Sequence, residues 1–231
     1  MAKWQLGDAT VTTGNPAGKV AVATLPEEAF WKGALDGNVK GSISATSGAN
    51  GVGVDYEVSF SNLPKEGGPF IYHIHVTPVP ENGNCTATQA HLDQYIRGED
   101  PACDPTRPQA CQQGDLSGKY GKISGNTTEP FTAKFSDPYT SLVEGEGAYF
   151  GNRSFVFHFA NKTRISCANF AVTNPGSNGT TPTYPSGSGG AKTSPTPSAY
   201  PSIPVTGAGA ALEVLKTLAF APVVAGFLAM L

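Results

Sequence analysis

Imidazole side chains are concentrated in one short part of this sequence. The chain has 231 residues and four histidines, and three of them, His73, His75 and His91, lie within residues 67–95. The fourth, His158, lies far downstream in the apolar run "SFVFHFA". Histidine is the commonest metal ligand in proteins, and a site made only of imidazoles suits copper or zinc. The four histidines are therefore a candidate set of metal ligands.

The spacing of His73 and His75 suits a strand that presents both rings together. In a strand, side chains at positions i and i+2 point to the same face, so the two imidazoles could chelate one metal ion. Tyr72, Ile74 and Val76 alternate with them and would form the apolar face. The same alternation also suits two polar residues on the solvent face of an edge strand, so the pattern alone leaves both readings open.

The four cysteines allow three disulfide pairings. Cys103 and Cys111 bracket the turn "DPTRPQA" and could close a small local loop. That pairing would leave Cys85 with Cys167, which would join the long middle segment to the last predicted strand. A mixed cysteine and histidine metal site is the alternative, although disulfides are more common in secreted proteins.

The elements that must position these residues are short strands. Alternating or β-branched runs recur between glycine, asparagine and proline, and in residues 53–63 they place Val54, Tyr56, Val58 and Phe60 on one face. Seven such runs are visible: 18–25, 38–46, 53–63, 70–76, 129–137, 153–161 and 164–173. They predict an all-β fold, a Greek-key barrel or sandwich of about eight antiparallel strands. We also expect a short helix at Leu25–Trp31 and one long, cysteine-bearing connection at 77–128.

Composition divides the chain into three parts. Residues 1–173 carry nearly all the aromatic residues and can bury a core. Residues 174–207 are rich in Ser, Thr, Pro and Gly, which predicts a disordered stalk. Residues 208–231 end in a short apolar tail after small residues, an order typical of a glycolipid-anchor signal that is removed; a tail-anchor helix or a plain C-terminal helix are the alternatives. The candidate attachment residues are Gly207, Ala208 and Gly209.

Several features point to a location outside the cell. Five sequons are candidate glycosylation sites: Asn84, Asn126, Asn152, Asn161 and Asn178. The even cysteine count and the stalk agree with them. The N-terminus shows no secretory signal, which predicts a truncated gene model if the anchor is real. The net charge of −3 favours neither a nucleic-acid partner nor an acidic lipid surface.

The order of several short motifs resembles a known family. "HIH", "NCTATQAH", "GDLSGKYG", "FVFH" and "RISC" follow one another as they do in the copper–zinc superoxide dismutases. The chain is most similar to the zinc-free, copper-only branch of fungal cell surfaces, whose members are often glycolipid-anchored. The likeness covers residues 15–173, and that family has a β-sandwich architecture.

The resemblance implies a role for each histidine. His73, His75 and His158 match the three permanent copper ligands, and His91 matches the histidine that bridges copper and zinc in the two-metal enzymes. Arg164 matches the arginine beside the copper that attracts the superoxide anion. It also implies one copper per chain.

Cys85 and Cys167 match the family disulfide, and Asp115 matches the aspartate ligand of zinc. Because copper takes every histidine, Asp115 alone cannot hold zinc, and we expect none. Only "FANKT" separates the last copper ligand from the arginine, so we expect an open copper site. Relatives often carry glutamate where this chain has Gln112. We expect Asp115, directly or through water or Gln112, to hold the second nitrogen of His91.

These features predict an extracellular, copper-only superoxide dismutase that converts superoxide to O2 and H2O2. The substrate would be superoxide. A lipid anchor would attach the protein to the membrane or cell wall, and we expect the protein to be a monomer. The alternative is a non-catalytic copper-binding or structural cell-wall domain on the same fold. A plain adhesion module, which would bind no metal, is a third interpretation.

Overall fold

The computed structural model describes residues 6–33, 39–125 and 129–174. They lie in the first of two units, Met1–Tyr184 and Pro185–Leu231. The predicted stalk and anchor signal, the candidates Gly207, Ala208 and Gly209, and the sequons at Asn126 and Asn178 fall outside these residues. Within the described part of the chain, every helix is too short or too polar to cross a bilayer.

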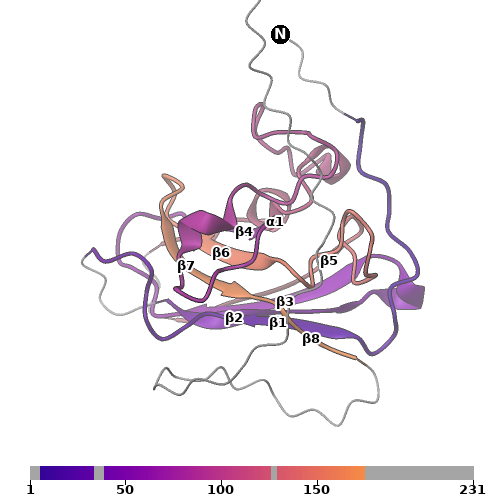
Figure 1. Cartoon of the computed structure of the whole chain (residues 1–231). Coiled ribbons are helices and arrows are strands. Elements are labelled where there is room, and N and C mark those ends of the chain that lie inside the picture. Colours follow the sequence, from indigo (N-terminus) through magenta and orange to yellow (C-terminus); the bar gives the residue numbers. More distant parts are fainter. Residues whose placement is uncertain (1–5, 34–38, 126–128, 175–231) are drawn as a thin grey trace, which may run out of the picture. The chain divides into compact units, whose positions relative to one another are not determined.

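In these described residues, eight strands form two antiparallel sheets that lie as two layers (Figure 1). Their bounds are β1 Val20–Thr24, β2 Lys40–Ser47, β3 Val54–Ser61, β4 Ile71–His75, β5 Phe131–Asp137, β6 Ser154–His158, β7 Arg164–Asn169 and β8 Ala171–Thr173. The order is β5-β3-β2-β1-β8 in the larger sheet and β4-β6-β7 in the smaller one. The chain crosses between the sheets after β3, β4, β5 and β7. This is the Greek-key architecture that the sequence predicts, so the predicted fold class is confirmed.

The core lies between the two layers and is mainly aromatic. Alternation in β3 buries Val54, Tyr56, Val58 and Phe60 and exposes the residues between them, as expected. Phe60 stacks on Phe155 of β6 with 5.7 Å between ring centroids. Because the inner face of the smaller sheet is occupied in this way, its histidines can only lie on the outer face.

The long segment between β4 and β5 covers that outer face (Figure 1). It contains the 3₁₀ turns η2 (Cys85–Thr88) and η3 (Pro108–Ala110) and the short helix α1 (Leu116–Tyr120); a further turn, η1 (Ala49–Gly51), joins β2 to β3. Backbone hydrogen bonds tie the segment to β4, from Leu92 N to Ile74 O at 2.8 Å and from Ile74 N to Gly114 O at 2.9 Å. As a result all five residues of β4 are buried.

Two predictions of local structure are wrong. Leu25–Trp31 forms no helix, because tertiary contacts hold both of its ends; the Leu25 N–H donates to the Gly41 carbonyl of β2 at 2.9 Å. The Trp31 N–H donates to the Ile165 carbonyl at 3.1 Å, and the Phe30 side chain packs against the Cys85 and Cys167 cluster. The predicted last strand, 164–173, is two strands, β7 and β8, since the chain passes from one sheet to the other between them.

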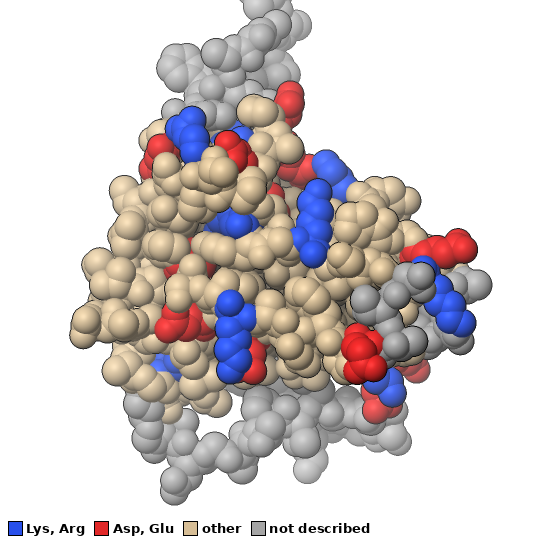
Figure 2. All heavy atoms as spheres, turned by 180° about the vertical axis from the view of Figure 1, so that it is seen from behind, with Lys and Arg blue, Asp and Glu red and all other residues tan. Residues whose placement is uncertain are grey.

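Charged side chains of both signs are interspersed on the molecular face that Figure 2 shows. The exposed ion pairs of the described residues include that of Lys134 with Glu57 at 3.0 Å. On that face the described residues form no continuous basic surface.

Candidate metal centre

All four histidines meet on the outer face of the smaller sheet. β4 supplies His73 and His75, and β6, its neighbour, supplies His158 from the position paired with Ile71. The long segment returns beside β4 and forms an isolated bridge between His75 and His91. The ring centroid of His73 lies 3.9 Å from that of His91 and 4.9 Å from that of His158. Residues separated by 85 positions in the chain thus form one cluster.

Backbone carbonyls fix the tautomers of His75 and His158. The Nδ1 of His75 lies 2.9 Å from the Gln89 carbonyl, and the Nδ1 of His158 lies 2.9 Å from the Lys162 carbonyl. A carbonyl oxygen only accepts a hydrogen bond, so each Nδ1 must carry the proton. Each Nε2 then has a free lone pair, and these two atoms face each other 3.3 Å apart.

The other two histidines are held in the same way by side chains. The Nε2 of His73 lies 3.2 Å from the Ser117 hydroxyl and 3.4 Å from a carboxylate oxygen of Asp115. Its Nδ1 is buried and has no hydrogen-bond partner within the described residues. The Nδ1 of His91 lies 2.7 Å from the Oε1 of Gln112. Each ring therefore has a partner on one nitrogen and offers the other to the cluster.

This arrangement fits a metal ion. The three rings of His73, His75 and His91 can present ligand atoms within 4.8 Å of one another, and His158 adds a fourth. Unpaired nitrogen lone pairs that face one another in a buried site repel, and a cation between them removes that repulsion. A set of four imidazoles suits copper or zinc.

Burial keeps the rings of His75, His91 and His158 neutral. Burial, followed by the neighbouring histidines, lowers the pKa of His75 and of His158 to about 2. Burial also lowers the pKa of His91 to about 4, although the hydrogen bond with Gln112 acts in the opposite direction. At neutral pH the rings are thus in the form that binds metal.

We expect the metal-free protein to lose stability as the pH falls below about 6.5. An unfolded histidine takes up a proton near that pH, whereas His75 and His158 stay neutral in the folded chain down to about pH 2. The unfolded state binds more protons in this window, and each of these two histidines contributes about 1.4 kcal/mol, so the free energy of unfolding should be about 3 kcal/mol lower at pH 5.5 than at pH 7.5. Urea unfolding of the metal-free chain at both pH values measures it, and equal values would contradict the expectation.

Arg164 lies at the rim of the histidine cluster. It begins β7, and its guanidinium donates to the carbonyl of Thr86 at 2.8 Å and to that of Gln89. The cleft beside it has a volume of about 440 Å³ and is lined by His75, His158 and Arg164 among others. Because the Gln89 carbonyl also accepts from His75, the guanidinium is fixed relative to that ring.

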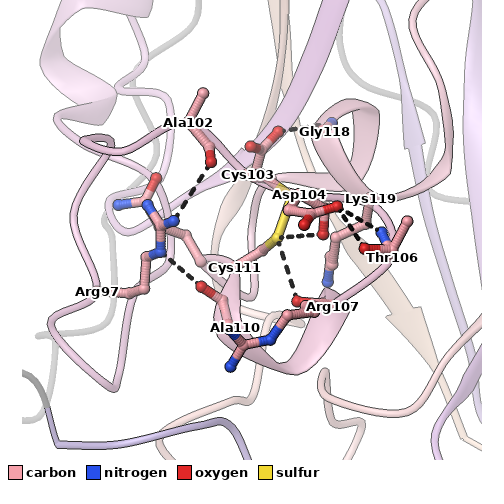
Figure 3. The surroundings of a disulfide bond; sticks show 12 residues. Arg97, Ala102, Cys103, Asp104, Thr106, Arg107, Ala110, Cys111, Gly118 and Lys119 are labelled. Atoms are coloured by element: carbon pink, nitrogen blue, oxygen red, sulfur yellow. Dashed lines mark hydrogen bonds between the residues drawn. A yellow bond between two sulfur atoms is a disulfide. The ribbon is translucent and has the colours of Figure 1, made fainter.

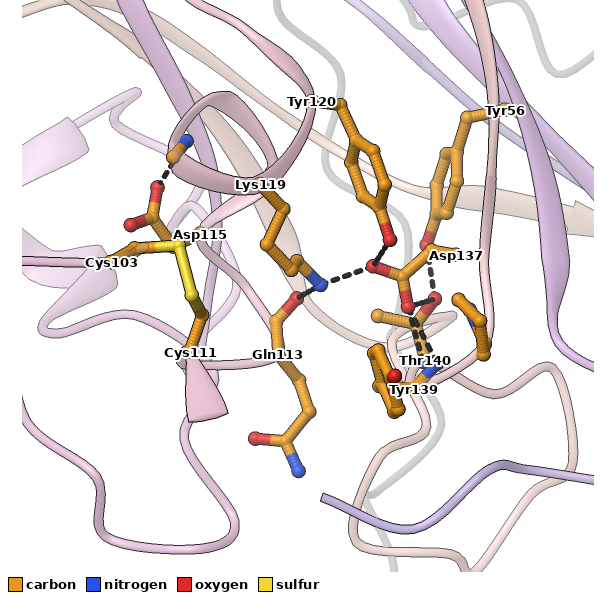
Figure 4. A network of polar contacts seen from close by, with 12 residues as sticks. Tyr56, Cys103, Cys111, Gln113, Asp115, Lys119, Tyr120, Asp137, Tyr139 and Thr140 are labelled. Atoms are coloured by element: carbon orange, nitrogen blue, oxygen red, sulfur yellow. Dashed lines mark hydrogen bonds and ion pairs between the residues drawn. A yellow bond between two sulfur atoms is a disulfide. The ribbon is translucent and has the colours of Figure 1, made fainter. Parts of the chain in front are cut away.

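Asp115 contacts His73 and not His91. It is the N-cap of α1, where one carboxylate oxygen accepts from the Gly118 N–H at 2.8 Å (Figure 4). Burial would raise its pKa, but the hydrogen bond with His73 and the Gly118 N–H hold the pKa at about 2. The expected direct contact from Asp115 to His91 is therefore wrong, and the Gln112 side chain takes that place.

Comparisons with known proteins identify the family. No protein-family model matches the chain. A cell surface Cu-only superoxide dismutase of Arthroderma benhamiae is 38% identical over 79% of this chain and 54% of its own length. The cell surface Cu-only superoxide dismutase 5 of Candida albicans is 35% identical over 74% of this chain and 68% of its own length. The chain belongs to the family of cell-surface copper-only superoxide dismutases.

A solved structure supports the same assignment. The copper(II) form of Candida albicans superoxide dismutase 5 aligns with a TM-score of 0.57 and 34% sequence identity, over 68% of this chain and 94% of that one. The chain spans only about half the length of the Arthroderma relative. Part of the longer relative therefore lies outside the compared region.

Both disulfides among the described residues pair as the sequence suggested. Cys85 is bonded to Cys167 with 5.7 Å between Cα atoms, which joins η2 to β7 beside the cluster. Cys103 is bonded to Cys111 with 5.0 Å between Cα atoms and closes a local loop (Figure 3). The first disulfide holds Thr86 and Gln89, whose carbonyls fix Arg164 and His75, close to β7.

Three sequons of this family member lie on described residues. The side chains of Asn152 and Asn161 are exposed. Asn84 is half-buried, and its side-chain oxygen accepts from the Thr86 N–H at 2.9 Å as the N-cap of η2. Glycosylation of these residues stays a prediction.

Sequence reasoning missed two acidic residues near the site. Asp93 accepts from the Nε2 of Gln112 at 3.0 Å, and Glu99 forms an ion pair with Lys162 at 2.6 Å at the rim of the cleft. The hydrogen bond from Lys162 lowers the pKa of Glu99. The sequence did indicate Asp93, because it lies two positions after His91, and in an extended segment two such side chains point to the same face. The partner of Glu99 lies 63 residues away and gave none.

Proposed function

We propose that this chain is an extracellular, copper-dependent superoxide dismutase that needs no zinc. The observation that carries the proposal is the cluster of four imidazoles, each with one nitrogen free, beside a fixed guanidinium. The relatives named as Cu-only superoxide dismutases support the same metal and the same substrate.

Copper, when bound, supplies the one-electron chemistry that converts two superoxide anions to O2 and H2O2. His73, His75, His158 and His91 would hold it through the nitrogens that lack a partner. Arg164 presents a positive charge at the cleft, which attracts a small anion even on a protein with a net charge of −3. The neutral His91 ring carries its proton on Nδ1, which donates to the Gln112 oxygen. Its Nε2 can therefore take up a further proton when it is not bound to metal.

We propose that no zinc is needed because the polar side chains near the site already have other partners. Copper would use all four histidines of the chain. Asp115, the counterpart of a zinc ligand, accepts from Gly118 and contacts the ring of His73. Gln112 offers a neutral amide, which is a weak ligand for zinc. Apart from the histidines, the described residues near His91 do not form a tetrahedral set of zinc ligands.

The cell surface is the proposed location, since both named relatives are cell surface proteins. A stalk at 174–207 and a lipid-anchor signal at 208–231 would place the domain of residues 1–173 outside the membrane or in the cell wall. We propose that the domain acts as a monomer, because one chain supplies every residue of the site.

Superoxide turnover and metal content of the purified chain test this function. After copper loading we expect one copper and no zinc per chain, with rapid turnover at pH 7.5. Copper binding without turnover would instead support the non-catalytic copper domain, and a chain that binds no copper would contradict both.

We expect Arg164→Ala to lower kcat/KM for superoxide by about tenfold at low salt, because the anion loses its cationic guide. The effect should shrink as the ionic strength rises, since salt screens the same attraction. Arg164→Lys keeps the charge and serves as the matched control. Copper content should be equal in all three proteins, and a tenfold loss in the lysine variant as well would argue against electrostatic guidance.

A further inference from the structure

The Gln112 amide lies between a ring nitrogen and a carboxylate. Its Oε1 is 2.7 Å from the Nδ1 of His91, and its Nε2 is 3.0 Å from the Oδ2 of Asp93. Gln112 is 7% exposed, so water competes little for these bonds. An amide has one accepting and one donating end, and its orientation decides which end His91 meets.

Asp93 is itself fixed by the backbone that follows it. Its Oδ1 accepts from the Arg97 N–H at 2.9 Å, and its Oδ2 accepts from the Gly98 N–H at 2.8 Å. With the Gln112 amide, three N–H groups point at this one carboxylate. A carboxylate surrounded by donors acts only as an acceptor, so the NH2 end of Gln112 must face Asp93.

The loop that carries these donors is braced from the other side. The Arg97 guanidinium donates to the carbonyls of Ala110 and Ala102 (Figure 3). It also donates to those of Gly98 and Pro101. The Cys103–Cys111 disulfide closes the same loop, and Gln112 follows it directly. The two ends of the Asp93–Gln112 contact are thus held by one cross-linked loop.

We propose that Asp93 is a positioning residue that sets the tautomer of His91 through the Gln112 amide. With its NH2 on Asp93, Gln112 presents its oxygen to His91, and the proton of the neutral ring must lie on Nδ1. Nε2 then keeps the lone pair that the metal cluster needs. A reversed amide would present its NH2 to Nδ1, move the ring proton to Nε2 and remove that lone pair.

The Asp93 carboxylate also accounts for a neutral amide, rather than a carboxylate, beside His91 at position 112. A glutamate at position 112 would bring a second carboxylate within hydrogen-bond distance of Asp93, and two like charges so close repel. In this chain the amide at position 112 and the carboxylate at position 93 therefore depend on each other. Placing the amide at 93 and the carboxylate at 112 should again leave the His91 proton on Nδ1. The inference concerns the site of the proposed function, but the tautomer is a property of the metal-free chain.

The test is a reciprocal exchange read by ¹⁵N NMR of the His91 ring in the metal-free protein at pH 7.5. The starting protein should show the proton on Nδ1. Asp93→Asn offers an NH2 to Gln112, so the amide should reverse and the Nε2–H tautomer should appear. Asp93→Asn with Gln112→Glu should restore Nδ1–H, because a carboxylate at 112 accepts from both neighbours. Asp104→Asn, in the same loop, is the control and should change nothing.

An unchanged Nδ1–H signal in Asp93→Asn would overturn the inference, as would a double variant that keeps the Nε2–H tautomer. Copper titration provides a second readout: Asp93→Asn should weaken binding about 10- to 100-fold, the usual effect of losing a partner behind a ligand, and the double variant should recover it. A starting protein that binds no copper would contradict the proposed function while leaving the tautomer result intact.

Discussion

Replacing His158 by alanine is expected to lower superoxide turnover by more than about 100-fold. Loss of a residue that merely orients a ligand costs about 10- to 100-fold in metal affinity or activity, so loss of the ligand itself should cost more. The ring is 3% exposed, and its Nε2 faces that of His75 at 3.3 Å. Without it, the cluster keeps three nitrogens and gains a space that water can enter.

The experiment must separate loss of a ligand from loss of the fold. His158→Gln is the matched variant, because its amide can still donate to the Lys162 carbonyl that now accepts from Nδ1. We expect this variant to remain folded by circular dichroism and to lose copper and turnover as fully as alanine does. Near-normal copper content and turnover in the folded glutamine variant would show that His158 is not a copper ligand.

The sequence predicts most of the fold because the strand signal is local. The alternation in residues 54–60 depends only on neighbouring residues, and the structure confirms it. The helix predicted at Leu25–Trp31 failed for the opposite reason, since its residues are held by Ile165 and by the disulfide cluster, far along the chain. Local preference is overridden where a short segment has strong distant partners.

The candidate site shows the same division. The spacing of His73 and His75 predicts a shared face, and the structure places both rings there. The partner of each ring could not be read from the sequence in this way. Whether Asp115 meets His73 or His91 depends on how α1 docks on β4, a distance of a few ångströms that residue order does not encode. The orientation of a single amide is further still from any sequence pattern.

The docking of α1 depends on a buried ion pair. The Lys119 ammonium donates to the Gln113 carbonyl at 2.9 Å and to Asp137 at the end of β5, and both charged side chains are fully buried (Figure 4). Asp137 also accepts from the Tyr120 hydroxyl at 3.0 Å and from the Thr140 N–H at 2.9 Å. Every lone pair of the carboxylate thus has a donor, which is what makes a buried charge tolerable.

We expect Lys119→Met to lower the free energy of unfolding by about 3–5 kcal/mol, because it leaves the Asp137 carboxylate buried without its counter-ion. Urea unfolding at pH 7.5 measures the change. The exposed pair of Lys134 and Glu57 supplies the matched control, since Lys134→Met should cost only about 0.2–1 kcal/mol. Equal effects of the two substitutions would contradict the importance of burial.

The double variant Lys119→Met with Asp137→Leu decides what the pair contributes. If its main role is to avoid an unpaired charge, the double variant should recover much of the lost stability, as replacements of buried ion pairs by apolar residues often do. Copper affinity should recover less, because α1 carries Asp115 and Ser117 to the ring of His73, and that placement relies on directional bonds that methionine and leucine lack. A double variant that regains both stability and copper affinity would show that apolar packing alone suffices to place α1 against the metal centre.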